Sequence, residues 1–353
     1  MNTIYIRTLK RAEHTVFCVA DGQKTYFDPQ FKRYIPFSSG QQVKRSLIDT
    51  LNASLNTQGS PTTFLFDVKK GELKEGEVYA TCNPIYADQL FGGWMKAVKA
   101  SKENPSSRTL KRRSPISISA MRGLHPLLAG VGKENASFDR SDRPNNIIKV
   151  RDEKGNELSE SDIAALLEGK DRSLSRKWIP NNSRATGLFV HDMAIDLRRL
   201  FSVLLNPLEP EISAEVETQL REANWVETQN IFGKCLTAPK SLRKEWIPAI
   251  VDGIIDWKIT SNQSRTFSLM ETLGLSISND ANLIASSIRA KLNEEDRATP
   301  IIDESLEGVN TFITLPAAAY IKTKSEKATA MKDARQELIK RLENFDYENQ
   351  LKV

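Results

Sequence analysis

The sequence lacks the features that mark membrane, secreted or metal-dependent proteins. No run approaches the roughly 18 apolar residues that cross a bilayer, and the polar start MNTIYIRTLKRAEHTVF has no signal-peptide core. The cysteines, Cys18, Cys82 and Cys235, are too few and too widely spaced for a disulfide framework or a zinc site, so we expect buried thiols. The composition predicts a cytoplasmic protein with no metal and no other cofactor.

Signatures of common enzyme classes are also missing. There is no G-x-x-x-x-G-K-[ST], G-x-G-x-x-G, G-x-S-x-G or H-E-x-x-H motif, which counts against ATPases, nicotinamide enzymes, serine hydrolases and zinc proteases. His14, His125 and His191 have no evident nucleophile or carboxylate partner in the sequence, so we interpret them as structural. The carboxylates of 151–171 do not follow calcium-loop spacing. We therefore expect no catalytic residue and no enzymatic activity.

Length and charge permit a protein that binds a polyanion. The chain has 353 residues, enough for about two domains, and a net charge of +5, which allows a nucleic-acid partner without requiring one. Alternating and helical segments follow each other without a regular strand–helix–strand rhythm. This order favours an α+β fold, a sheet that carries long insertions.

The stretch PFSSGQQVKRSLID, at 36–49, is the most informative part of the sequence. A small-residue turn leads into a predicted helix whose apolar face carries Val43, Leu47 and Ile48. Backbone N–H groups, side-chain amides and cations gather in its first two turns, which suits an extended anion such as a phosphate backbone. The alternative is an ordinary amphipathic helix with a solvated basic face.

Two neighbouring segments are also basic. At 26–36, aromatic and basic residues interleave in what Pro29 predicts to be a loop, a composition that suits either single-stranded nucleic acid or a packed loop. The segment 96–113 carries seven basic residues against one acid, and Pro105 excludes a continuous helix. We expect it to be an exposed, mobile basic loop with an electrostatic function. By contrast, we expect 225–246 to be a loop-rich region.

Four segments together carry a family resemblance: an N-terminal strand, SSGQQVKRSL at 38–47, SPISISAMRGLHP at 114–126 and GLFVHDMAIDLRRLF at 187–201. In order and spacing they resemble the Cas-seven (DevR-type) family, the backbone subunits of type I CRISPR surveillance complexes, also called Cascade. The segments span about the first two thirds of the chain. Their combination carries the resemblance, since none of them is decisive alone.

The resemblance implies a fold and an assembly. The fold is a modified RNA-recognition-motif (ferredoxin-like) palm with a helical finger insertion and a thumb hairpin. We assign 1–85, 187–206 and 250–353 to the palm, 86–186 to the finger-like insertion and 207–249 to the thumb region. Several copies would assemble head to tail along a CRISPR RNA, present its bases to target DNA, and meet other Cascade subunits of the Cas5, Cas6 and Cas8 types. In the family, the thumb of one copy kinks the guide held by the next.

The resemblance also implies site residues. The helix that matches 39–46 would face the guide backbone, and further contacts would come from 122–125 and from a donor-rich turn at 262–265. The RNA-binding candidates are Ser39, Gln41, Gln42, Lys44, Arg45, Arg122, His125, Asn262, Ser264 and Arg265. On charge alone, the candidates for target DNA are Lys99, Lys102, Arg108, Lys111, Arg112 and Arg113.

Two other functions stay open from the sequence. A type III-like relative would cleave target RNA with a loop aspartate, and Asp21 and Asp28 lie near the relevant end of the palm, although turn aspartates are usually capping residues. A protein-interaction module with a basic surface, unrelated to CRISPR, would purify without nucleic acid.

Overall fold

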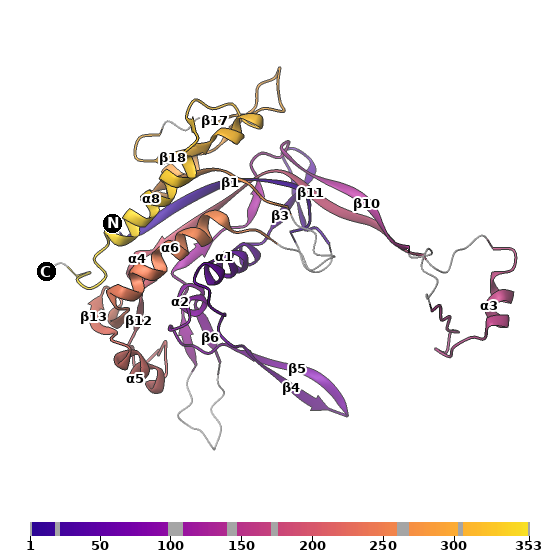
Figure 1. Cartoon of the computed structure of the whole chain (residues 1–353), viewed down its shortest axis with the longest axis horizontal. Coiled ribbons are helices and arrows are strands. Elements are labelled where there is room, and N and C mark those ends of the chain that lie inside the picture. Colours follow the sequence, from indigo (N-terminus) through magenta and orange to yellow (C-terminus); the bar gives the residue numbers. More distant parts are fainter. Residues whose placement is uncertain are drawn as a thin grey trace. The chain divides into compact units, whose positions relative to one another are not determined.

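Strand β1 (Thr3–Thr15) lies within the largest sheet of a computed structural model that describes residues 2–17, 22–97, 109–139, 147–170, 176–259, 268–302 and 306–351 (Figure 1). The alternation expected at its start is confirmed. Ile4 and Ile6 are fully buried in one apolar cluster, whereas Leu9 is buried in another. Successive side chains of a strand point to opposite faces, so Ile4 and Ile6 share one face of β1 and Leu9 lies on the other.

The large sheet is mixed, which agrees with the expected α+β class. Its main path runs β19 (Glu326–Lys327), β18 (Asn310–Thr314), β15 (Thr272–Ser278), β1, β11 (Arg176–Asp196), β9 (Met121–Gly123), β3 (Arg33–Ser38) and β2 (Thr25–Asp28). Two further strands, β8 (Ile116–Ile118) and β10 (Ala129–Asp139), also pair with β11. β18 and β19 run parallel, while β1 pairs antiparallel with both β11 and β15. An RNA-recognition-motif palm stays a prediction.

Helices cover one face of this sheet. α1 (Gly40–Ser54) packs against α6 (Lys240–Asp256), which in turn packs against α8 (Ala330–Glu343), and Figure 1 shows α1 and α6 on the same side of β1. A Cβ at Gly253 of α6 would lie 3.0 Å from the Leu47 carbonyl oxygen of α1, so the glycine allows this close approach. The apolar face expected for 36–49 is confirmed, because Val43 and Leu47 are fully buried.

The opposite face has a smaller apolar cluster. Leu9 of β1 and Val190 of β11 pack there with Ile288 and Ile302. The nearby elements are α7 (Ala281–Ser286), β16 (Ala290–Lys291), β17 (Ile301–Ile302) and the 3₁₀ helix η1 (Leu315–Ala319). This face therefore has an apolar end, while its other end carries the polar side chains described below.

The expectation of a loop-rich region at 225–246 is wrong. After α4 (Leu197–Leu200), a small sheet joins β12 (Ser202–Leu204), β14 (Gly233–Thr237) and β13 (Val226–Asn230), and α5 (Ala214–Glu222) connects β12 to β13. Trp225, Leu236 and Trp246 are in the core. Lys234, Lys240 and Lys244 are exposed on these elements, whereas Arg243 is buried and donates to the Ala238 carbonyl at 2.6 Å, so strands and a helix replace the expected loops.

A different hairpin does project. β4 (Thr63–Lys69) and β5 (Glu72–Tyr79) pair with each other, and every residue except Tyr79 is exposed on them. Figure 1 shows the hairpin extending away from α1 and α2 (Ala87–Gly92). A two-stranded sheet exposed on both faces gains little stability from burial. Among the described residues the hairpin makes few other contacts, one of them between Tyr79 and Lys96, whose ammonium lies 5.6 Å from the ring centroid.

Contacts divide the chain into two compact units, Met1–Gly130 with Ala185–Val353, and Val131–Arg184. The second unit contains α3 (Glu160–Leu167), which Ser159 caps: its hydroxyl accepts from the Asp162 N–H at 3.3 Å. Residues 86–130 belong to the first unit by this division, and the palm, finger and thumb boundaries stay predictions. No helix in the described residues is long and apolar enough to cross a membrane.

Candidate nucleic-acid interface

The three sequence blocks at 38–47, 114–126 and 187–201 meet in the first unit. Ser38 of β3 pairs with Met121 of β9, and Arg122 of β9 pairs with Val190 of β11. Ile118 of β8 pairs with Met193 of β11. Segments separated by many residues in sequence therefore form one continuous surface at this end of the sheet.

The start of α1 is built into that surface. Ser39 caps the helix, because its hydroxyl accepts from the Gln42 N–H at 3.3 Å. A Cβ at Gly40 would lie 2.5 Å from the Ile118 carbonyl oxygen, so only glycine lets the helix begin against the end of β8. Gln41 is exposed and Gln42 is half-buried. The first N–H groups of a helix lack intrahelical partners, and they carry the positive end of the helix dipole.

The two cations of α1 have different environments. The Lys44 ammonium donates to the Gly92 carbonyl at 2.9 Å and to the Ser114 hydroxyl at 2.6 Å, and burial together with nearby Arg112 lowers its pKa to about 8. It holds α1 to the end of α2, so its geometry does not support the predicted contact with a guide phosphate. The Arg45 side chain is 75% exposed, and Asp49, one turn later at 3.0 Å, is its ion-pair partner among the residues that the structure describes. Arg45 is therefore free to reach a phosphate.

Arg122 belongs to a charged cluster on the sheet. Its guanidinium donates to Asp192 Oδ2 at 2.8 Å, while Arg7 of β1 donates to Asp192 Oδ1 at 2.6 Å. Burial raises the pKa of Asp192, but its bonds to Arg7 and Arg122 outweigh that effect and hold the pKa below its usual range. Two guanidinium groups share one carboxylate, which leaves a net positive charge with Arg122 37% exposed. Arg7 and Asp192 are paired positions of β1 and β11, where opposite charges stabilise the sheet. The candidate site predicted from the sequence did not include this pair.

The predicted loop at 26–36 is instead a β-hairpin. β2 and β3 pair from Thr25 with Pro36 to Asp28 with Arg33, and Pro29 occupies the turn between them. A proline suits a turn and does not exclude the strands on either side, where aromatic and β-branched residues favour extended backbone. The interpretation as a loop failed because it extended the effect of one proline to the whole segment.

This hairpin exposes aromatic rings beside the charged cluster. Phe27 is 51% exposed and Tyr34 is 66% exposed, with their ring centroids 5.3 Å apart. Tyr26 packs on Phe37 at 6.0 Å, and Phe37 pairs with Arg122 on the neighbouring strand. Exposed rings next to cations suit unpaired bases joined by phosphates. We give the name α1–β9 surface to the exposed rings of Phe27 and Tyr34 together with the start of α1 and Arg122.

His125 has a structural environment. Its ring packs edge-on against Phe31 at 4.8 Å, and Nδ1 accepts from the Leu127 N–H at 3.1 Å. Burial lowers the pKa of His125, with Asp28 opposing the effect, so the ring is neutral at physiological pH. A neutral imidazole with one nitrogen already engaged is a poor phosphate ligand, which weakens its assignment to RNA.

The remaining predicted residues divide between exposed, buried and undescribed positions. Lys111 and Arg113 are exposed, but Arg112 is buried and donates to the backbone carbonyls of Arg199 and Ser202. The expectation that 96–113 is an exposed loop is therefore wrong at Arg112, which lies in β7 (Leu110–Arg112), paired with β6 (Trp94–Lys96). The residues outside the described part of the chain are Lys99, Lys102, Arg108, Asn262, Ser264 and Arg265.

The described residues include two of the three cysteines. Cys82 and Cys235 are free and buried, as expected, and Cys18 lies outside the described residues. Within those residues no group of three His, Cys, Asp or Glu side chains could hold a metal ion.

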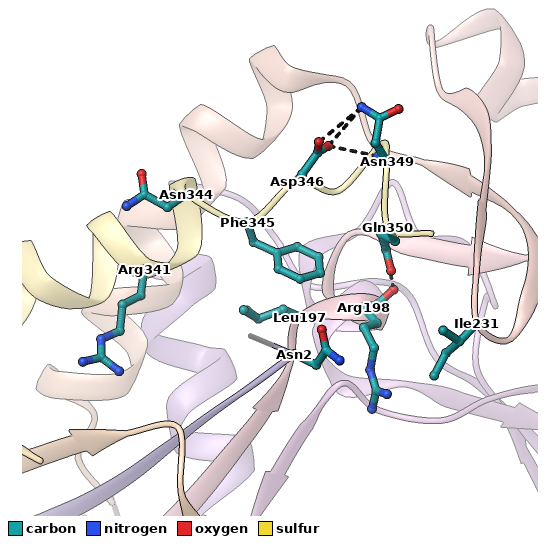
Figure 2. Close-up of a pocket in the computed structure, with 10 residues that line it drawn as sticks. All are labelled: Asn2, Leu197, Arg198, Ile231, Arg341, Asn344, Phe345, Asp346, Asn349 and Gln350. Atoms are coloured by element: carbon teal, nitrogen blue, oxygen red, sulfur yellow. Dashed lines mark hydrogen bonds between the residues drawn. The ribbon is translucent and has the colours of Figure 1, made fainter. Parts of the chain in front are cut away.

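A separate hollow lies near the chain ends (Figure 2). Leu197, Ile231 and Phe345 form part of its lining, with Arg198 and Arg341 nearby. Both cations are already paired: Arg198 donates twice to Asp196, at 2.8 and 3.0 Å, and Arg341 donates to Glu337 at 2.6 Å. Since its positive charges are neutralised within the chain, this hollow does not suit a polyanion.

Comparisons with known proteins give structural likenesses, of which two are described here. A chain described as "CRISPR RNA-guided surveillance complex, pre-nicking" aligns with a TM-score of 0.48 and 8% identity, covering 95% of this chain and 100% of that one. A chain described as "CRISPR RNA-guided surveillance complex" aligns with a TM-score of 0.41 and 10% identity, covering 95% and 99%. No protein-family model and no curated protein matches the sequence. Likeness at these scores assigns neither a family nor a function.

Proposed function

We propose that this chain is a backbone subunit of a type I CRISPR surveillance complex that holds CRISPR RNA and presents its bases to target DNA. The observation that carries the proposal is the meeting of the three resemblance blocks at the α1–β9 surface. Blocks that merely resembled a family by chance would have no reason to be adjacent in space. Here they bring the start of α1 and Arg122 together, and the β2–β3 hairpin that carries the exposed rings pairs with β9 beside them.

The chemistry of this surface suits RNA held without regard to sequence. Arg45, Arg122 and the helix N–H groups offer contacts to phosphates, which carry no base identity. Phe27 and Tyr34 offer ring faces on which any base can stack. Any guide can then be loaded, and the bases left unpaired by the protein supply specificity by pairing with DNA.

The exposed hairpin β4–β5 is our candidate for the thumb, in place of 207–249. One side of it carries Phe64, Phe66 and Val68, each more than half exposed, in a hairpin that nothing else in the described chain covers. A projecting element with apolar side chains is suited to contact a neighbouring copy of the same chain. The packed segment 207–249 has no comparable exposed hairpin among its described elements.

We propose that the subunit has no catalytic activity of its own. Asp28, an aspartate considered for RNA cleavage, uses Oδ1 to accept from the Phe31 N–H at 2.8 Å, the usual role of an aspartate in a turn. Incubation of the assembled complex with Mg²⁺ and a complementary RNA separates the alternatives. Regularly spaced cuts would contradict the non-catalytic role.

The proposal is tested by purifying the chain from cells that also express a CRISPR array. We expect a high ratio of absorbance at 260 nm to that at 280 nm and a large species that becomes small after ribonuclease treatment. A monomer free of nucleic acid before and after digestion would contradict the proposal and favour a protein-interaction module.

A further inference from the structure

A basic hollow lies between β7 and the segment 206–211. Its volume is about 510 Å³. The hydrogen bond from the Lys111 N–H to the Pro210 carbonyl, at 3.3 Å, holds its two walls together. We call it the β7 groove, and its polar lining includes Thr109, Lys111, Arg113, Arg199, Asn206 and Glu209.

The alternation of β7 sets the charge of the groove. Arg112 points inward, where its guanidinium is fully buried and contacts the Trp94 ring at 5.3 Å. Lys111 and Arg113 consequently point outward to line the groove. Within the described residues neither of these two exposed cations has an ion-pair partner.

Arg199 forms a fixed cation in the opposite wall. Its guanidinium carbon lies 3.7 Å from the Phe232 ring centroid, and Nη1 lies 3.4 Å from Glu211 Oε1. Only 18% of this side chain is exposed, so its orientation is set by packing. An ordered arginine loses less conformational entropy on binding an anion than a mobile surface arginine does.

The two carboxylates of the groove do not cancel this charge. Glu211 is buried between Arg112 and Arg199, and it also accepts from the Leu204 N–H at 2.8 Å. Burial lowers the pKa of Arg112 only to about 10, so its guanidinium stays charged at neutral pH. Glu209 is exposed to solvent. The three cations that line the groove, Lys111, Arg113 and Arg199, and the buried Arg112 stand against two carboxylates, which leaves an excess of two positive charges.

We infer that the β7 groove binds the phosphodiester backbone of a nucleic-acid strand, with Lys111, Arg113 and Arg199 as its ligands. An excess of cations on two facing walls, in a lining that also includes the neutral polar side chains of Thr109 and Asn206, suits a tetrahedral anion on a continuous chain. The charge-only prediction counted Arg112 as a ligand and missed Arg199. In the groove Arg112 has a different role: it is buried, donates to the Arg199 carbonyl and pairs with Glu211. That the groove binds a nucleic-acid backbone does not rest on the proposed function. Only the identity of the strand, guide RNA or target DNA, rests on it.

The test uses the full chain assembled with guide RNA. The variant Lys111→Ala with Arg113→Ala removes two groove cations, and its matched control, Lys244→Ala with Lys332→Ala, removes two exposed lysines from α6 and α8. For each complex we would measure RNA per protein and the affinity for matching target DNA over a range of salt concentrations. If DNA is the ligand, we expect unchanged RNA content, an affinity reduced about tenfold or more, and a salt slope smaller by about two.

The outcomes distinguish guide RNA from target DNA as the ligand, and they distinguish failure of the groove inference from failure of the proposed function. Loss of RNA content in the groove variant, but not in the control, would identify the guide as the ligand. Groove and control variants that behave alike in both measurements would overturn the inference. If wild-type chain carries no RNA, the proposed function fails, and the groove is then tested with a single-stranded DNA oligonucleotide on the full chain. Equal binding by groove and control variants would again overturn it.

Discussion

Lys44 and Arg45 are adjacent in sequence, yet their side chains make different contacts. The Lys44 ammonium is bonded inside the protein, whereas Arg45 faces solvent. We expect Arg45→Ala to weaken RNA binding and reduce its salt slope by about one, with little change in stability. Lys44→Ala should instead cost about 1–3 kcal/mol of stability, because the Gly92 carbonyl and Ser114 hydroxyl lose their donor.

Urea unfolding and RNA titration on each variant would check this pair. Each variant serves as the control for the other, since each loses one charge from the same helix. A Lys44→Ala protein of normal stability but poor RNA binding would contradict the roles given to the two side chains.

Lys10 makes the stability of the protein depend on pH. Its ammonium is buried and donates to the carbonyls of Ile255, Trp257 and Met270 and to the Thr272 hydroxyl. Burial lowers the pKa of Lys10 from 10.5 to about 7, with Asp256 opposing the shift and Lys258 adding to it. Between these two values the unfolded chain binds more protons than the folded one, so this group makes stability rise with pH.

The effect of Lys10 is measured by comparing wild type with Lys10→Met. Other groups that titrate in this range, including Lys44, affect both proteins alike. From pH 7 to pH 9 we expect wild type to gain on the order of 2 kcal/mol more stability than Lys10→Met does. Urea unfolding at several pH values gives the difference, and parallel curves for the two proteins would contradict the buried titration.

At the scale of elements, the α1–β9 surface depends on how closely α1 approaches β8. Gly40→Ala would place a Cβ 2.5 Å from the Ile118 carbonyl oxygen, so the helix start must shift. We expect a loss of about 1–3 kcal/mol in stability, together with weaker RNA binding. Gly92→Ala is the control, because nothing lies within 4 Å of a Cβ there. Similar urea midpoints for the two variants would show that this contact does not position the helix.

The exposed hairpin β4–β5 should matter for assembly and not for folding. Because the hairpin contacts little else in the chain, replacing 63–79 by a short Gly-Ser linker should change the stability of the remaining protein by under about 0.5 kcal/mol. If the hairpin joins neighbouring copies, the variant should bind RNA as single copies. Analytical ultracentrifugation with guide RNA would check this, using Phe64→Ser with Phe66→Ser as a milder variant. Wild-type assemblies from the deletion variant would exclude the hairpin as the contact.

The sequence alone predicted those helices and strands whose burial follows from the local spacing of apolar residues. The helix at α1, with its turn of small residues and its apolar stripe, and the alternating start of β1 are examples. It failed where tertiary contacts decide the outcome. Nothing local distinguishes the half-buried Lys44, which donates to the end of α2, or the buried Arg112, which pairs with Glu211, from their exposed neighbours Arg45 and Arg113. The β7 groove was missed for the same reason, since Arg199 and Lys111 are far apart in sequence.

At the scale of the whole molecule, the proposed surfaces have different partners. The α1–β9 surface and the hairpin lie on different elements of the first unit, so one copy can hold RNA while its hairpin contacts the next copy. Such a contact joins two different surfaces, and it generates an open row of copies unless the rotation between them closes a ring. RNA length, and not symmetry, then sets the number of copies.

This arrangement predicts that stoichiometry follows guide length. Lengthening the guide should add copies in whole steps, and each step should need the same number of added nucleotides, because every copy covers the same length of backbone. Native mass spectrometry of complexes assembled on guides of graded length would give the copy number directly. The hairpin deletion is the control, since it removes the contact between copies but keeps the RNA surface. A copy number that stays constant as the guide lengthens would contradict a row of copies, because a closed ring fixes its number by geometry alone.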